Sequence, residues 1–174
     1  MIKILFILNS FGTGGSERVV LDICRGINRD LFEPFVASLS DGGLAREFDK
    51  IHVWNICLNK KEGVDVRLML RLASMVREIG IDVINAHHFS PFIHAYPSSL
   101  IAHSSLIYTD HTIHEIMQIP LIWKLVGTVL LKTCYGVVGI SHGCTRQLRE
   151  TFHVPTHKAM TILNAIDLGR FKHR

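Results

Sequence analysis

The residues best placed to do chemistry are a group of glycines near the N-terminus. Gly12, Gly14 and Gly15 follow an unbroken apolar run, residues 3–8, and precede a segment whose apolar residues recur every three or four positions, residues 19–27. Glycine lets a backbone approach a ligand closely, and the free N–H groups at a helix N-terminus attract anions. This strand–turn–helix pattern predicts an anion site, with a tight structural connection as the alternative.

Two nucleotide-binding motifs nearly fit this turn. The P-loop pattern needs Gly-Lys-Ser or Gly-Lys-Thr, which the sequence lacks, and G-x-G-x-x-G fails because Glu17 stands where its third glycine belongs. If Asp41, after the second predicted strand, bound a ribose, the chain would be a nicotinamide-dependent oxidoreductase. That function is one alternative, and a non-enzymatic module that binds a sugar or a partner protein is another.

A second group of candidates consists of polar residues that end the predicted strands. They are Ser10, His87, His88, His111, Ser141 and Asn164. Ligands of a parallel sheet bind outside the carboxyl ends of its strands, so these residues should rim one crevice together with the glycine turn. The histidines follow no established zinc spacing such as H-E-x-x-H, so we expect no metal site.

The elements that must position these residues are short apolar runs alternating with helical patterns. The alternation predicts an α/β fold: a Rossmann-like, doubly wound, mostly parallel sheet of about seven strands, in the order 3-2-1-4-5-6-7, with helices on both faces. Ser16 is a candidate cap for the first helix, and Pro97 predicts a break or kink in the fourth. The predicted strands are residues 3–8, 32–40, 51–58, 81–86, 106–109, 135–140 and 160–163.

Length and composition limit which folds and functions are possible. A chain of 174 residues suffices for one domain with a full core, and a net charge of +4 makes no case for nucleic-acid binding. The four cysteines include no C-x-x-C pair, so we expect reduced core residues of a cytosolic protein without a signal peptide. The apolar residues 120–131 are too few to span a membrane. We expect a buried crossover helix there, with peripheral insertion into a membrane surface as the alternative.

Four segments, in order, resemble the GT-B glycosyltransferases of family 4. They are FGTGGSERVV at residues 11–20, DVINAHH at 82–88, VVGIS at 137–141 and KAMTILNAIDLGRF at 158–171, where Ala165 replaces the usual glycine. The resemblance implies that residues 1–174 are a single Rossmann-like domain, the N-terminal, acceptor-side domain of such an enzyme. The C-terminal donor-binding domain is expected to be absent, because its glutamate pair, separated by seven residues, has no counterpart in the sequence.

The resemblance also implies a reaction and a site. The whole enzyme would transfer a sugar, with retention, from a nucleotide-sugar donor to a glycan or lipid-linked acceptor, without a metal ion. It would serve cell-surface polysaccharide biosynthesis, in the cytoplasm or at the cytoplasmic face of the membrane, and this fragment alone would be inactive. His111 would be catalytic, beside the donor sugar, and Gly14 and Gly15 would bind the donor diphosphate. The acceptor-side residues would be Asn9, Phe11, Ser16, His88, Thr112 and His114, with Ser141 and Asn164 on the crevice rim.

Overall fold

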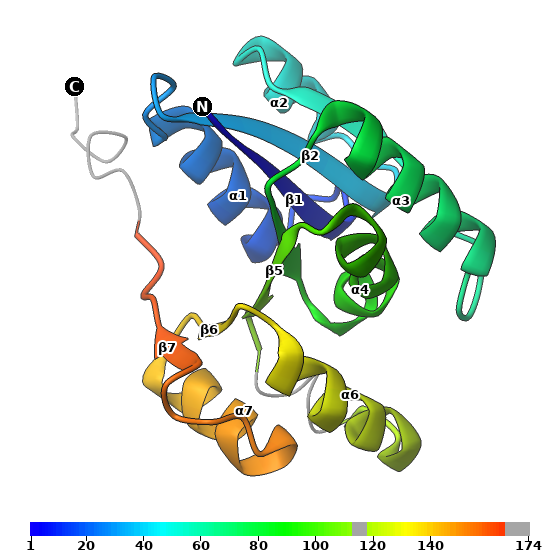
Figure 1. Ribbon diagram of the computed structural model, residues 1–174. Coiled ribbons are helices and arrows are strands. Elements are labelled where there is room, and N and C mark those ends of the chain that lie inside the picture. Colours follow the sequence, from blue (N-terminus) through cyan, green and yellow to red (C-terminus); the bar gives the residue numbers. More distant parts are fainter. Residues whose placement is uncertain (113–117, 166–174) are drawn as a thin grey trace.

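The computed structural model describes residues 1–112 and 118–165, in which seven strands and six helices alternate (Figure 1). The strands are β1 (Ile2–Ser10), β2 (Phe32–Ser40), β3 (Trp54–Cys57), β4 (Val83–His87), β5 (Ser105–Asp110), β6 (Gly136–Gly139) and β7 (Ala159–Thr161). The helices are α1 (Gly15–Gly26), α2 (Ala45–Lys50), α3 (Val66–Ile79), α4 (Phe89–Ala102), α6 (Leu121–Thr133) and α7 (His142–Phe152).

All seven strands run parallel in a single sheet, in the order β3-β2-β1-β4-β5-β6-β7. This confirms the predicted Rossmann-like architecture and the predicted strand order. The register sets Leu5 of β1 opposite Phe35 of β2 and Ile84 of β4. Because every strand points the same way, their C-terminal ends meet at one side of the sheet, which we call the carboxyl edge.

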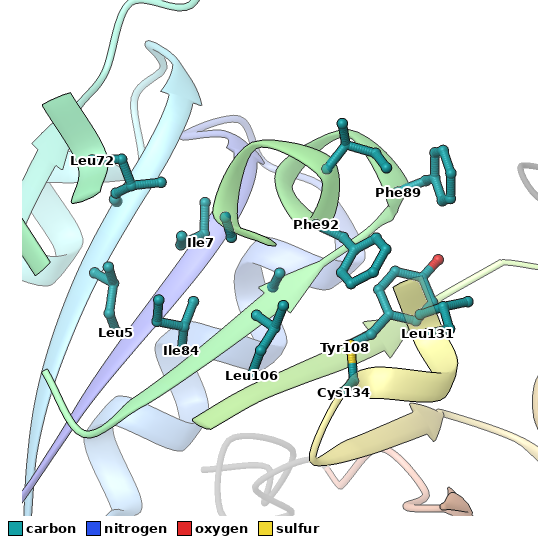
Figure 2. Packing of buried hydrophobic residues seen from close by; sticks show 14 of the residues in the cluster. Leu5, Ile7, Leu72, Ile84, Phe89, Phe92, Leu106, Tyr108, Leu131 and Cys134 are labelled. Carbon is teal, nitrogen blue, oxygen red and sulfur yellow. The ribbon is translucent and has the colours of Figure 1, made fainter. Parts of the chain in front are cut away.

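Helices lie on both faces of the sheet, but they cover the two faces unequally. On one face, α3, α4, α6 and α7 share a large core with the sheet, and Figure 2 shows Leu72, Phe92 and Tyr108 packed within it. On the other face, α1 and α2 form a smaller core with β1 and β2 around Phe6 and Phe48. Beyond α1 on that second face, the strands β5, β6 and β7 line a groove of about 810 Å³.

Local sequence signals explain where α3 begins and ends. The Asp65 carboxylate accepts a hydrogen bond from the Leu68 N–H (3.0 Å), which satisfies one of the unpaired donors of the first turn. Gly80 ends the helix in the left-handed conformation, with φ 73°, and only glycine adopts this conformation readily. β4 therefore starts at Val83, a short connection after the helix.

Three of the helices differ from what the sequence predicts. Gly14, not Ser16, is the N-cap of α1. α4 runs through Pro97 without a break. The expectation of a buried crossover helix is wrong for much of α6, where only Gly127 and Leu131 are buried. The sequence of α6 is apolar around most of its circumference, so it does not indicate which side packs against the protein.

The cysteines, unlike these three helices, largely agree with the sequence prediction, which places them in the core. All four thiols are free, and three of them are buried, Cys24, Cys134 and Cys144. Burial raises the pKa of both Cys24 and Cys134 to about 12, so these two thiols are protonated and unreactive at neutral pH.

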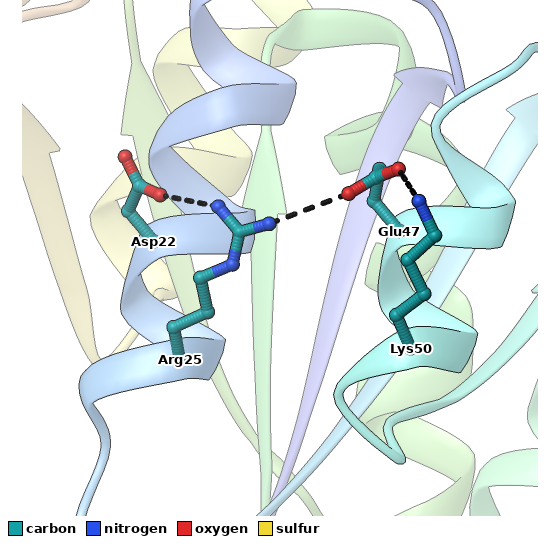
Figure 3. Close-up of polar contacts among 4 residues, drawn as sticks. All are labelled: Asp22, Arg25, Glu47 and Lys50. Carbon is teal, nitrogen blue, oxygen red and sulfur yellow. Dashed lines mark hydrogen bonds and ion pairs between the residues drawn. The ribbon is translucent and has the colours of Figure 1, made fainter. Parts of the chain in front are cut away.

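A chain of polar contacts joins the outer sides of α1 and α2 (Figure 3). Arg25 of α1 contacts Asp22 at 3.2 Å and Glu47 of α2 at 3.5 Å, and Lys50 contacts Glu47 at 2.6 Å. The hydrogen bond from Lys50 is the main reason that the pKa of Glu47 lies below its ordinary value. These side chains are partly exposed, so the contacts align the two helices but stabilise the fold only slightly.

Within the described part of the chain, no helix combines the length and the apolar composition needed to cross a bilayer.

Candidate functional site

The glycine turn brings unpaired backbone donors to the carboxyl edge. The first intrahelical bond of α1 runs from the Arg18 N–H to the Gly14 carbonyl (3.2 Å), so the N–H groups of Gly15, Ser16 and Glu17 precede the intrahelical ladder. A Cβ on Gly15 would meet no atom within 4 Å, so open space adjoins its backbone. Together with the positive end of the α1 dipole, this geometry suits an anionic ligand.

Neighbouring groups hold the turn in place. The Gly12 N–H donates to the Ser10 hydroxyl (3.1 Å), and the Leu44 N–H donates to the Phe11 carbonyl (2.8 Å). A Cβ on Gly42 would collide with that same carbonyl, so the segment after β2 packs directly against the turn. The turn is therefore fixed before any ligand arrives.

A buried carboxylate lies against the turn, and the sequence prediction missed it. Glu17 accepts hydrogen bonds from the hydroxyls of Ser16 (2.7 Å) and Ser10 (3.4 Å). A Cβ on Gly14 would collide with this carboxylate, so a larger residue there would have to displace the end of the Glu17 side chain. The sequence feature that could have indicated a role for Glu17 is its position as an acidic residue in the first helical turn, where it complements the helix dipole. Glu17 adds a hydrogen-bond acceptor to a turn that otherwise offers donors.

Three histidines meet where β4 and β5 end. His87 Nδ1 lies 2.7 Å from His111 Nε2, and their ring centroids are 5.0 Å apart. The ring of His88 also adjoins His111, with 5.1 Å between the two ring centroids. Within residues 1–112 and 118–165, no three His, Cys, Asp or Glu side chains converge in a way that could hold a metal ion. The rings of His87 and His88 both contact the ring of His111.

Burial determines where the proton of His87 lies. His87 is 1% exposed, and its Nε2 has no hydrogen-bond partner among the described residues. Burial, and secondarily His111 and His88, hold the pKa of His87 well below its ordinary value, so the ring is neutral. A buried N–H without an acceptor costs more than a buried lone pair without a donor. We therefore assign the proton of His87 to Nδ1, which donates to His111 Nε2.

The backbone of His88 is strained. Its φ of 75° and ψ of 165° fall in a region that is nearly exclusive to glycine. Its N–H donates to the Thr109 carbonyl (3.0 Å), which ties the end of β4 to β5. Strain of this kind costs roughly 1–3 kcal/mol and persists where the surrounding structure requires it. The strained position lies beside His111, as expected for a functional site.

The structure brings some of the predicted site residues together. His87, His111 and Asn164 line the same 810 Å³ groove, at the carboxyl edge. Asn85 and Thr109 line the groove as well, and the Thr109 hydroxyl donates to the Asn85 side-chain oxygen (2.8 Å). The sequence prediction missed this pair because both residues lie inside strands rather than at their ends.

Other predicted site residues lie elsewhere or have structural partners. The Phe11 ring is 1% exposed and packs against Phe48, so this structure does not present it to an acceptor. Ser141 caps α7 by accepting from the Cys144 N–H (3.1 Å). Asn9 and Thr112 are half-buried at the carboxyl edge. His114 lies outside the described residues.

Comparison with known proteins identifies the family. Residues 13–170 match the family model described as Glycosyltransferase Family 4. The chain belongs to this family. The match spans most of the chain and confirms the resemblance seen in the four sequence segments. A search of curated proteins found no match.

Several solved structures share the fold of this chain. HepE from Anabaena, in complex with UDP and glucose, matches with a TM-score of 0.82 at 20% identity, over 97% of this chain and 46% of its own. A glycosyltransferase from Rickettsia africae matches with a TM-score of 0.79 at 20% identity, over 98% of this chain and 45% of its own. MurG from Acinetobacter baumannii has a TM-score of 0.64 at 8% identity, with 96% and 46% covered. The chain thus spans a little under half the length of these structures.

Proposed function

We propose that this chain is the acceptor-side half of a retaining glycosyltransferase. The whole enzyme transfers a sugar from a nucleotide-sugar donor to a glycan or lipid-linked acceptor, in the cytoplasm, during synthesis of a cell-surface polysaccharide. Family membership supports sugar transfer, and HepE, which has the same fold, was solved with UDP-glucose. The observation that carries the proposal is the convergence of an open helix N-terminus and the His111 cluster at one edge of the sheet.

In this proposal the glycine turn binds the donor diphosphate. The N–H groups of Gly15, Ser16 and Glu17 donate to phosphate oxygens, and the α1 dipole stabilises the negative charge that develops on the leaving diphosphate. These fixed donors act on the same charge that a metal ion would neutralise in other transferases. The Glu17 carboxylate, which shares the turn, accepts a hydrogen bond from a sugar hydroxyl rather than contacting phosphate.

His111 lies at the reacting centre, beside the transferred sugar. His111 presents its ring to the transferred sugar, while His87 Nδ1 contacts its Nε2 and fixes the orientation of the ring. Asn9, His88 and Thr112 surround the acceptor at the same edge. Because each of these groups is already held by the sheet, little reorganisation is needed when the substrates bind.

The stereochemistry of the product tests the proposal. The gene product that contains this chain is incubated with UDP-glucose and acceptor, and the anomeric configuration is read by NMR. The expected product keeps the α-configuration of the donor, and EDTA leaves the rate unchanged. An inverted product, or loss of activity in EDTA, would contradict the proposal. A chain of residues 1–174 alone should show no transfer above trace donor hydrolysis.

A titration with NADH, followed by its fluorescence, tests the oxidoreductase alternative. The absence of the third glycine at Glu17 predicts no tight binding. Saturable binding of NADH that UDP-glucose does not displace would favour the oxidoreductase over the transferase.

A further inference from the structure

The carboxylate of Glu17 is buried directly beside the glycine turn. Glu17 is 5% exposed, and its two oxygens accept hydrogen bonds from the hydroxyls of Ser16 and Ser10. A Cβ on Gly14 would collide with Glu17 Oε2, so this oxygen adjoins the backbone that leads to the N–H donors of the turn. A ligand held by those donors is therefore close to a fixed carboxylate.

The described residues provide no cation in contact with this carboxylate. No Lys or Arg among them forms an ion pair with Glu17. Arg18, the next residue, is exposed, and its charge helps, after the Lys50 hydrogen bond, to lower the pKa of Glu47 on α2. The α1 dipole, equivalent to about half a positive charge, offsets the Glu17 carboxylate only in part. A negative charge therefore remains beside the N–H donors.

A second carboxylate lies in the segment that supports the turn. Asp41 follows β2 at the carboxyl edge, and its Oδ1 accepts a hydrogen bond from the Gly42 N–H (2.7 Å). Gly42 in turn packs against the Phe11 carbonyl, where a Cβ would collide. Asp41 is exposed, so water and salt screen its charge more than that of Glu17. Asp41 thus adds a weaker negative charge on the same side of the turn.

The two halves of a nucleotide-sugar respond differently to such a turn. The diphosphate is held by the backbone N–H groups, whereas the attached sugar meets the field of Glu17. A sugar hydroxyl can donate a hydrogen bond to a carboxylate, but a sugar carboxylate can only accept and carries the same charge. At a separation of about 8 Å and an effective dielectric constant of about 20, two like charges weaken binding by roughly thirtyfold.

We propose that Glu17 makes the donor site selective for nucleotide-sugars whose sugar is uncharged, and that it excludes donors whose sugar is a uronic acid. The buried carboxylate acts as a repulsive element, which is one of the two ways in which a site achieves specificity. This inference rests on the proposed function, because it takes the glycine turn to bind the donor diphosphate. It adds the chemical class of the transferred sugar.

Calorimetry with UDP-glucose and UDP-glucuronate tests the proposal on the gene product that contains this chain. These two ligands differ only in the oxidation of the sugar CH₂OH group to a carboxylate. The wild type should bind UDP-glucose at least about tenfold more tightly, and Glu17→Gln should reduce this preference by about fivefold or more. UDP-xylose, which lacks the CH₂OH group and is uncharged, is the control ligand. The preference for UDP-glucose over UDP-xylose should be the same in the wild type and in Glu17→Gln.

Two further variants separate charge from shape and position. Glu17→Asp keeps the charge and should keep most of the preference for UDP-glucose over UDP-glucuronate. Glu47→Gln makes the same chemical change on α2, at a carboxylate that contacts Arg25 and Lys50 (Figure 3), and should show the wild-type preference. Each result is a ratio of two affinities in one protein sample, so a fraction of unfolded protein does not alter it. Circular dichroism establishes that each variant is folded.

Three results would overturn this inference and leave the proposed function intact. The first is a wild type that binds UDP-glucose and UDP-glucuronate equally well. The second is an unchanged preference in folded Glu17→Gln, and the third is an equal loss of preference in Glu17→Asp and Glu17→Gln. A wild type that binds none of the three UDP-sugars would instead contradict the proposed donor site itself, so the two kinds of failure are distinguishable.

Discussion

The glycine turn and the histidine cluster lie at the same edge of the sheet but are built in opposite ways. The turn offers backbone donors at Gly15 and Ser16, with open space beside Gly15 and with no positive φ. The cluster offers side chains, with His87 buried and His88 strained around His111. One region is the connection between a single strand and helix, which the segment after β2 supports, whereas the other exists only when β4 and β5 pair.

This difference predicts how the two regions respond to mutation. A change in the turn should affect ligand binding with little effect on folding, because no protein group relies on the space beside Gly15. A change in the cluster should affect activity and stability together, because its rings contact each other and the core.

The largest expected effect comes from removing the centre of the cluster. In the full-length enzyme, His111→Ala should lower kcat by roughly a hundredfold or more, which is the usual loss for a group that stabilises the transition state. His103→Ala is the control, since His103 ends α4 at the opposite side of the sheet. Equal turnover of the two folded variants would show that His111 is only a strand-end residue.

The strain at His88 separates the contribution of the ring from that of the backbone. His88→Ala and His88→Gly both lose the ring contact with His111, but only glycine relieves the positive φ. The free energy of unfolding, from urea titration, should therefore be higher for His88→Gly than for His88→Ala by about 1 kcal/mol or more. If alanine proves the more stable of the two, the backbone at this position is not strained.

His94 shows what burial does to a histidine outside the cluster. Burial lowers its pKa below the ordinary value of 6.5; the hydrogen bond to the Ser90 carbonyl (2.8 Å) opposes this shift. As the pH falls below 6.5, the unfolded chain binds a proton that the folded chain resists, so the free energy of unfolding falls. Urea titrations on both sides of that pH should show a shallower fall for His94→Gln than for the wild type. His103→Gln, at an exposed position, is the control.

The smallest expected effect is at the polar contacts between α1 and α2 (Figure 3). Arg25→Ala removes the contacts to Asp22 and Glu47 and should lower the free energy of unfolding only slightly, because all three side chains are partly exposed. The difference should shrink further in high salt. A loss of several kcal/mol would mean that these contacts, and not the core around Phe48, hold α2 in place.

The sequence was sufficient to predict the sheet and the glycine turn because both depend on local patterns. β1 is a continuous apolar run, and Gly12, Gly14 and Gly15 follow it directly. Parallel topology then placed His87 and His111 at one edge, so their meeting could be predicted from strand ends alone.

Features that depend on tertiary packing could not be predicted in this way. The burial of the Phe11 ring depends on Phe48, which lies on α2 and is distant from the turn in the sequence. The apolar pattern of α6 is compatible with a core or with a lipid-facing surface, and only the contacts of Gly127 and Leu131 show which side faces inward. The tautomer of His87 likewise follows from the burial of its Nε2, which the spacing of residues in the sequence does not predict.

The central claim is that the glycine turn binds the donor, and Gly15→Val tests it most directly. Valine has a higher helix propensity than glycine, so it should not weaken this first helical position, and no protein atom lies within 4 Å of the new Cβ. A thermal melt of the 174-residue variant should therefore match the wild type. Gly26→Val, at the other end of α1 and also beside open space, is the matched control.

Calorimetry of UDP-glucose binding to the gene product that contains this chain measures the dissociation constant of each variant. We predict that Gly15→Val weakens donor binding by at least about tenfold, because its side chain fills the space that the diphosphate needs, while Gly26→Val binds like the wild type. Unchanged affinity in a folded Gly15→Val variant would contradict the account and leave the turn as a structural connection only.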